Sequence, residues 1–154
     1  MAHGGEKWGI VMLMGEYLHN LDEKNRLIIP SKFRMELGDK IVVTRGLEKC
    51  LFLYSIDDFQ KIVDKLKAIP FTKKEVREFM RFFLSGATIV EFDKQGRITI
   101  PSTLITYAEM KKECIVIGTG DRLEIWNKNV WDEFYNSTKD NMSEIAEKLF
   151  SFDE

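Results

Sequence analysis

The chain has 154 residues, 44% of them hydrophobic, and a formal net charge of −2. This length and composition can bury the core of one domain or of two intertwined halves, and no apolar run approaches the roughly 18–20 residues that cross a bilayer. The charge excludes a protein that binds nucleic acid through a generally basic surface, and we expect no membrane partner.

The first predicted elements are two extended segments, residues 15–21 and 26–29, joined by a short turn. Because so few residues separate them, they predict a β-hairpin. Asp22, at the first position of a type I turn, can accept a hydrogen bond from the backbone two residues on. Asn25 must adopt positive φ for the chain to enter the second strand. Arg26 leaves the turn at its rim.

The rest of the first half alternates between helix and strand. Pro30 ends the second strand and begins a short helix that Gly38 terminates. Residues 40–44 and 51–54 predict two further strands. Ser55 then caps an amphipathic helix with apolar side chains at i, i+3, i+4 and i+7. These side chains are Phe59, Ile62, Val63 and Leu66.

A helix from Phe71 and Thr72 to about Leu84 links the two halves. Its basic residues are Lys73, Lys74, Arg77 and Arg81. They are compatible with a DNA-reading helix, but Glu75 and Glu78 alternate with them, which favours the solvated face of a linker helix. Phe82 and Leu84 widen the apolar surface beyond one stripe, which indicates a subunit contact.

The second half repeats the first at an offset of 93 − 22 = 71 residues, without a gap from Gly15 against Gly86 to Ser31 against Ser102. The Asp, Arg, Pro and Ser of the two turn stretches are identical. We therefore interpret the chain as a duplicated supersecondary unit.

The elements of the second half follow the same order. The predicted strands are residues 86–92, 97–100, 114–118 and 122–126, and the predicted helices are 101–107, one capped by Asn127 and one from about Ser143. The last helix is expected to need a neighbouring chain to hold it. Since neither copy has enough strands to close a barrel and both leave exposed edges, we expect the two halves to interleave.

Catalytic and metal chemistry find little support in the sequence. Cys50 and Cys114 lack Cys-x-x-Cys or His-rich spacing, so we interpret them as buried, reduced thiols rather than zinc ligands. His19 has no nucleophile or orienting partner nearby, which favours a half-exposed strand histidine over a general base. Turn chemistry explains Asp22 and Asp93 without a carboxylate pair. We therefore expect no enzymatic activity, no cofactor and no small-molecule substrate.

The repeated motif carries a resemblance. The pattern Gly-x-Tyr-x-His-x-Leu-Asp-x-Lys-x-Arg-x-x-x-Pro-x-x-x-Arg, from Gly15 to Arg34, resembles the opening signature of the MraZ family, and the stretch from Asp93 to Pro101 resembles its second signature. Asn25 departs from the glycine usual in the family, but asparagine tolerates left-handed geometry, so we expect the loop shape to be kept.

The resemblance implies a fold and an organisation. The fold is an α+β, β-rich one, in which two AbrB/SpoVT-like halves form a swapped-hairpin β-barrel with peripheral helices. The expected segments are an N-terminal extension (1–11), a first repeat (12–70), a linker helix (71–85) and a second repeat with a C-terminal helix (86–154). The resemblance also implies a ring-shaped homo-oligomer, an octamer or similar.

The resemblance further implies a bacterial transcriptional regulator, cytoplasmic and nucleoid-associated. Its partner would be double-stranded promoter DNA with tandem repeats, upstream of the division and cell-wall gene cluster. The family's DNA contacts fall on Lys24, Asn25, Arg26, Gln95, Gly96 and Arg97. Arginine can pair with guanine edges through two hydrogen bonds, and Gln or Asn with adenine, and a glycine lets the backbone approach a phosphate.

Two alternatives remain open. Arg26 and Arg97 can instead form salt bridges with Asp22 and Asp93 and stiffen the turns, and the two roles can be combined. Lys32, Arg34 and Lys94 are expected to be DNA-backbone or ring contacts rather than base readers. The other class of function is a ring-forming scaffold whose arginine loops recruit an acidic protein partner.

Overall fold

The computed structural model describes residues 12–151 and contains eight strands and seven helical segments in that range. The strands are β1 (Leu13–Asn20), β2 (Arg26–Ile28), β3 (Lys40–Arg45), β4 (Leu51–Ser55), β5 (Thr88–Glu91), β6 (Arg97–Thr99), β7 (Glu113–Gly120) and β8 (Leu123–Asn127). The helices are α2 (Ser31–Leu37), α3 (Ile56–Lys67), α4 (Lys74–Ser85), α5 (Ser102–Tyr107), α6 (Lys128–Thr138), the 3-10 turn η1 (Lys139–Asn141) and α7 (Met142–Phe150). The predicted extension, residues 1–11, lies outside the described residues.

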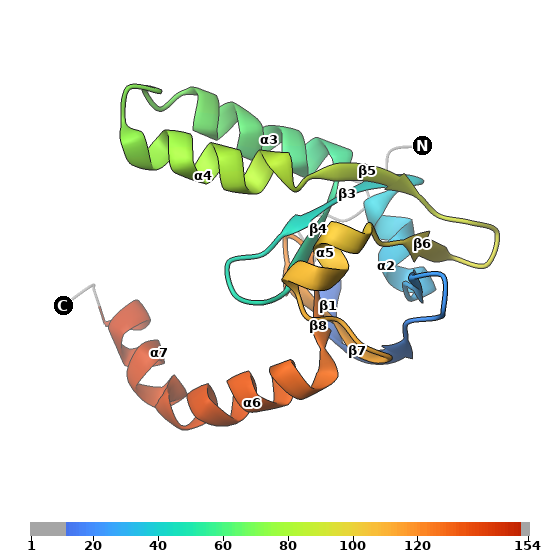
Figure 1. Cartoon of the computed structure of the whole chain (residues 1–154). Helices are drawn as coiled ribbons and strands as arrows, with labels where there is room; N and C mark the ends of the chain where they lie inside the picture. The colour runs from blue at the N-terminus through green and yellow to red at the C-terminus, as the bar shows by residue number, and fades with distance from the viewer. Residues whose placement is uncertain (1–11, 152–154) are drawn as a thin grey trace.

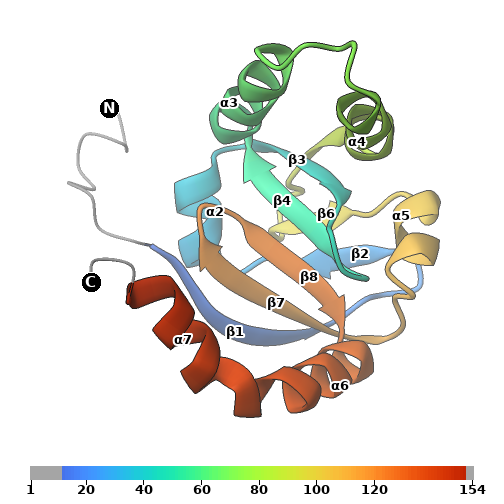
Figure 2. The same cartoon turned by 90° about the vertical axis from the view of Figure 1, so that its left-hand side faces the viewer.

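The two halves are interleaved through their strand pairing. One antiparallel sheet has the order β1-β7-β8-β4-β3-β5, and β2 pairs with β6 in a second, two-stranded sheet. Thus β1 pairs with β7, β5 with β3, β4 with β8 and β2 with β6, and in each pair one strand comes from each copy of the repeat. Because neither half has these ladders by itself, the repeated units form one structure (Figure 2).

This pairing corrects the predicted hairpins. The turns after β1 and β5 are closed as in a hairpin, since Asp22 N–H donates to the Arg26 carbonyl at 3.0 Å and Asp93 N–H to the Arg97 carbonyl at 2.9 Å. Beyond each turn the two strands separate, and each pairs with a strand of the other copy. Sequence proximity favours a hairpin locally, but pairing with the other copy buries Leu27 of β2 and Ile98 of β6 in the shared core.

The large sheet is open in its strand order. β1 and β5 each have one ladder partner and form its two edges, so the described strands do not close into a single hydrogen-bonded barrel. The fold class is α+β, as predicted, and the ladders between the described strands are antiparallel.

The main core lies between the two sheets and the short helices α2 and α5. Its centre holds side chains from both copies, among them Leu27, Ile98 and Phe33, each no more than 1% exposed. Leu27 and Ile98 are directly opposite in the β2–β6 ladder. Tyr17 of β1 packs edge-on against Phe33 of α2, with ring centroids 5.2 Å apart. This shared core fixes the positions of the two turns.

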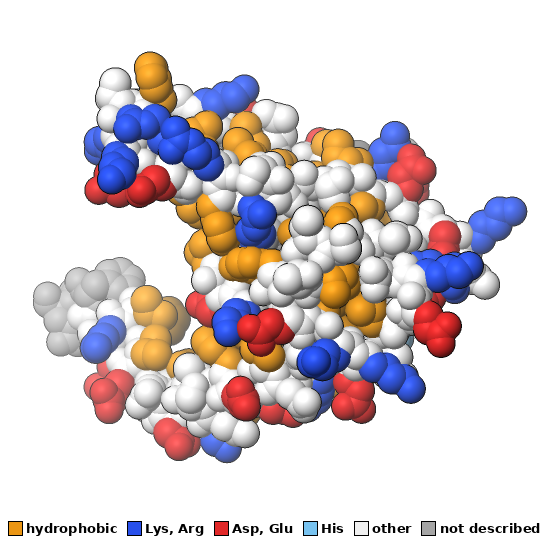
Figure 3. Space-filling model, viewed as in Figure 1, with side chains coloured by type: hydrophobic (Ala, Val, Ile, Leu, Met, Phe, Trp, Pro, Cys, Tyr) orange, Lys and Arg blue, Asp and Glu red, His pale blue; other side chains and the backbone are white. Residues whose placement is uncertain are grey.

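A second, aromatic cluster covers the other face of the sheet. Phe52, Tyr54 and Trp126 project from β4 and β8, and α3, α4 and α6 pack around them. Figures 1 and 2 show α3 with α4 as one helical arm and α6 with α7 as another, and Figure 3 shows hydrophobic side chains in the recess between them.

The helices follow the predicted pattern with one shift. The linker helix α4 begins at Lys74, two residues later than Thr72, because residues 70–73 form a turn in which Lys73 N–H donates to the Pro70 carbonyl at 3.2 Å. The Arg77 guanidinium also donates to the carbonyls of Phe71 and Thr72, both at 2.9 Å. In residues 12–151, no helix combines the length and apolarity needed to span a membrane.

Candidate nucleic-acid interface

The first turn, residues 22–26, is organised by one carboxylate. Asp22 Oδ1 accepts hydrogen bonds from the backbone N–H groups of Lys24 and Arg26, at 2.9 and 2.8 Å. Asp22 Oδ2 accepts a third from Arg26 Nε at 2.7 Å. Asn25 has a φ of 60°, and its N–H donates to the Asp22 carbonyl at 3.0 Å. The predicted turn, with its aspartate acceptor and its left-handed fourth residue, is confirmed.

The second turn, residues 93–97, repeats this arrangement. Asp93 Oδ1 accepts from the N–H groups of Gln95 and Arg97, both at 2.9 Å, and Asp93 Oδ2 accepts from Arg97 Nε at 2.7 Å. Gly96 has a φ of 78°. Arg97 Nη2 also donates to Gln95 Oε1 at 2.5 Å, a contact that ties the Gln95 amide to the turn.

Both aspartates are held in the charged form. The hydrogen bonds from the Arg97 backbone and guanidinium and from the Gln95 N–H lower the pKa of Asp93, against a smaller opposing effect of desolvation. At Asp22, partial desolvation favours the neutral form, but the bonds from Arg26 and Lys24 together outweigh it and lower the pKa. Each turn therefore contains a stable carboxylate–guanidinium pair, as the salt-bridge alternative predicted.

The two turns lie side by side. Ile29 N–H donates to the Gly96 carbonyl at 3.1 Å, and Ile100 N–H donates to the Asn25 carbonyl at 2.8 Å, so each turn is bonded to the strand that leaves the other. Arg97 Nη1 lies 4.0 Å from Asp22 Oδ2. Figure 1 shows both turns, one blue and one olive, at the end of the molecule away from the helical arms. We call this pair of turns, residues 22–26 and 93–97, the twin tips.

The two arginines differ in the use of their nitrogens. Arg97 contacts Asp93, Gln95 and Asp22 through all three. Arg26 uses only Nε, and its Nη1 and Nη2 make no hydrogen bond within residues 12–151. The Lys24 and Lys94 side chains are exposed beside them. The twin tips therefore combine an internally braced arginine with an arginine whose outer edge is free.

Gly96 is enclosed, in contrast to the open backbone that was expected. It is buried, its N–H donates to the Asp93 carbonyl at 3.0 Å, and its carbonyl accepts from Ile29. A Cβ at Gly96 would lie 2.7 Å from Arg34 Cζ and Nε. Glycine thus suits the positive φ and leaves room for the Arg34 guanidinium, and its N–H is already engaged inside the turn.

The remaining predicted contact residues occupy different places. Lys32 Nζ lies 5.0 Å from the centre of the Tyr17 ring and 5.3 Å from that of Phe33, a cation–π arrangement on α2. Arg34, also on α2, reaches the second tip and donates from Nε to the Ile29 carbonyl at 3.0 Å. The sequence did not predict that Arg34 would lie against Gly96, because Arg34 belongs to the first copy and Gly96 to the second.

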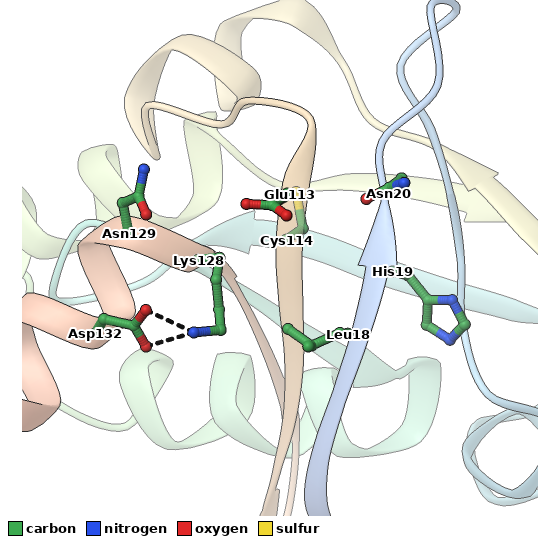
Figure 4. A pocket seen from close by; sticks show the side chains of 8 residues that line it. All are labelled: Leu18, His19, Asn20, Glu113, Cys114, Lys128, Asn129 and Asp132. Atoms are coloured by element: carbon green, nitrogen blue, oxygen red, sulfur yellow. Dashed lines mark hydrogen bonds and ion pairs between the residues drawn. The ribbon is translucent and has the colours of Figure 1, made fainter.

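A separate hollow of about 530 Å³ lies between β1, β7 and the start of α6. Lys128 and Asp132 form an ion pair there, with Nζ 2.5 Å from Oδ2. Figure 4 shows the His19 ring on the far side of β1 from this pair. Cys114 is buried, its thiol donates to the Lys111 carbonyl at 3.2 Å, and burial raises its pKa to about 11. These groups do not form a nucleophile–base pair.

The fold and the twin tips define a duplicated α+β protein, with its two copies interleaved and its paired turns at one end. The sequence model described as "MraZ protein, putative antitoxin-like" matches residues 12–82 and again 83–153. The chain belongs to the MraZ family, a regulator-like family. A solved structure, "The solution structure of PHS018 from pyrococcus horikoshii", is 16% identical over 73% of this chain and 87% of that one, with a TM-score of 0.29.

Proposed function

We propose that the chain is a sequence-specific DNA-binding transcriptional regulator that contacts duplex DNA through the twin tips. The observation that carries the proposal is the adjacency of the tips, in which Arg97 of one turn lies 4.0 Å from Asp22 of the other. Two rigid turns at one end of the molecule present their side chains to a single ligand. Rigidity supports recognition because little conformational entropy remains to be lost on binding.

The side chains at the tips suit a duplex. Lys24 and Lys94 are exposed and can contact phosphates, and the free edge of Arg26 matches the O6 and N7 acceptors of guanine. Asn25 and Gln95 carry amides of the kind that pair with adenine. Arg97 can join them by exchanging its Gln95 contact for DNA. Gly96, buried beneath Arg34, supports the turn instead of touching the ligand.

Self-association completes this proposal. The apolar residues of α7 are 40% exposed at Ile145, 60% at Leu149 and 74% at Phe150, and a second copy would cover them. The twin tips of one subunit present few cations that lack a partner within residues 12–151, so its affinity for a single site is low. An assembly of several subunits, a ring of eight or a similar number, would engage tandem repeats spaced by a helical turn and gain avidity by orders of magnitude. Family membership suggests promoter repeats upstream of the division and cell-wall genes, and hence a cytoplasmic, nucleoid-associated protein.

The test is a titration of labelled duplex carrying tandem promoter repeats, with a scrambled duplex as control, at several salt concentrations. We expect tighter binding to the repeats and a steep loss with salt. Arg26→Ala and Arg97→Ala should each abolish the complex while the oligomer stays intact by light scattering. Equal, weak binding to both duplexes would instead support a scaffold that recruits an acidic protein. Wild-type binding by both variants would refute the role of the tips.

A further inference from the structure

Arg34 crosses from the first copy of the repeat to the second tip. Its Nε is fixed by the Ile29 carbonyl at 3.0 Å, and its guanidinium lies against Gly96, so close that a Cβ there would be 2.9 Å from Nη2. The backbone of α2 holds the base of the side chain, since the Arg34 N–H donates to the Pro30 carbonyl at 3.1 Å. The hydrogen bond to the Ile29 carbonyl and the contact with Gly96 therefore place the guanidinium without a ligand.

The outer edge of Arg34 is open. Its Nη1 and Nη2 make no hydrogen bond within residues 12–151, and neither is among the buried unpaired polar atoms of that range. The side chain lines a hollow of about 560 Å³ beside the second tip, which Lys40 and Asp93 also line. Three carboxylates also line this hollow: Asp93 pairs with Arg97 at 2.7 Å and Glu91 with Lys40 at 3.5 Å, whereas Asp39 forms no ion pair within residues 12–151.

In the part of the chain that the structure describes, the first tip has no cation at the position that corresponds to Arg34. The repeat offset of 71 places Ile105 at the position of Arg34, and Ile105 packs against the main core. The same offset places Asn25 at the position of Gly96. The two tips therefore differ: Arg26 has a free outer edge at the first, whereas at the second Arg97 is braced at all three nitrogens and the free edge belongs to Arg34.

We propose that Arg34 is a phosphate-contacting residue of the second tip, so that the two tips of one chain bind DNA unequally. The inference rests on the proposed DNA-binding function and adds a third arginine to it. Two parallel N–H groups of a preoriented guanidinium match two oxygens of one phosphate, and this geometry is specific to arginine. A phosphate contact contributes affinity and salt dependence without base preference.

The test uses Arg34→Gln and Arg34→Lys on the full chain, with a duplex that carries one repeat. Loss of one phosphate contact should weaken binding about tenfold for repeat and scrambled duplex alike, and reduce the slope of log K against log salt by about 1. Arg34→Lys should recover the slope and only part of the affinity, because lysine keeps the charge and loses the fork.

A structural role is distinguished by a matched variant. Gly96→Ala also disturbs the second tip but leaves the charge of Arg34, so it should lower affinity without changing the salt slope. An unchanged slope in Arg34→Gln, with or without lost affinity, would overturn the proposal, as would loss of preference for the repeat over the scrambled duplex. If wild-type protein fails to bind even the duplex with tandem repeats, the DNA-binding function itself is refuted, which is a different result.

Discussion

Arg97 Nη1 lies 4.0 Å from Asp22 Oδ2, so the arginine of the second turn reaches the aspartate of the first. The same guanidinium donates to Asp93 at 2.7 Å, and it therefore bridges two carboxylates that are 71 residues apart in sequence. Only the interleaving of the two copies, through β2 and β6, permits this contact. A change in one tip should accordingly be felt in the other.

The order of the tips should depend on acid pH. The hydrogen bonds to Asp22 and Asp93 lower the pKa of each carboxyl in the folded chain. A lowered folded pKa means that the stabilisation is complete above the unfolded value, about 3.9, and is lost as the pH falls through the folded value. We expect the amide resonances of Lys24 and Gln95 to move together below about pH 4 in an NMR titration.

Asp93→Asn provides the control for this titration. Asparagine keeps an oxygen acceptor for the Gln95 and Arg97 amides but does not titrate. The Gln95 amide of this variant should therefore lose its acid transition, whereas the Lys24 amide should keep it. An unaltered Gln95 transition in Asp93→Asn would show that another group controls the turn.

Alanine should be poorly tolerated at Gly96. Positive φ of 78° strains any side chain there, and the new Cβ would meet Arg34 Cζ at 2.7 Å. We expect Gly96→Ala to lower the free energy of unfolding by about 1–3 kcal/mol in urea denaturation. The matched change at the other tip, Asn25→Gly, relieves left-handed strain and should shift it by less than about 1 kcal/mol. Equal effects at the two positions would contradict this account.

The pairing of the two copies should be the most sensitive part of the fold. Leu27 and Ile98 are 0% and 1% exposed and face each other across the β2–β6 ladder. Leu27→Ala or Ile98→Ala should each cost about 2–5 kcal/mol of unfolding free energy. Ile28→Ala, in the same strand but 40% exposed, is the control and should cost much less. If Ile28→Ala is as harmful as Leu27→Ala, the shared core is not what holds the tips together.

Local chemistry made much of the fold predictable. The turns followed from Asp22 and Asp93, because a short carboxylate can accept from the backbone two residues on. The helix N-caps were equally predictable. The Ser55 hydroxyl accepts a hydrogen bond from Asp58 N–H at 3.1 Å, and the Asn127 side chain accepts one from Asn129 N–H at 2.9 Å. Each of these interactions joins residues only two or three positions apart, so both partners can be recognised in one short stretch of sequence.

Strand partners were not predictable in the same way. The turn at Asp22 favours pairing of β1 with β2, and nothing in that stretch says that β1 will pair with β7. Which strand β1 pairs with depends on burial across the whole chain, and a short stretch of sequence does not show that burial. The contact of Arg34 with Gly96 was not predicted for the same reason. Only the three-dimensional structure shows that Arg26 Nη1 and Nη2 make no hydrogen bond within residues 12–151, because salt bridges and ligand contacts use the same residue types.

The exposed face of α7 should control assembly. All nine residues of the helix are exposed, including Ile145 and Leu149, which is costly in water unless a neighbouring chain covers them. We expect Leu149→Glu to reduce the particle mass in multi-angle light scattering while the far-ultraviolet circular dichroism stays unchanged. Ser151→Glu adds the same charge at the exposed C-cap of the helix, on the side opposite Leu149, and should leave the mass unaltered. An undiminished mass in Leu149→Glu would show that α7 is not a subunit contact, and the avidity expected on tandem repeats would then need another interface.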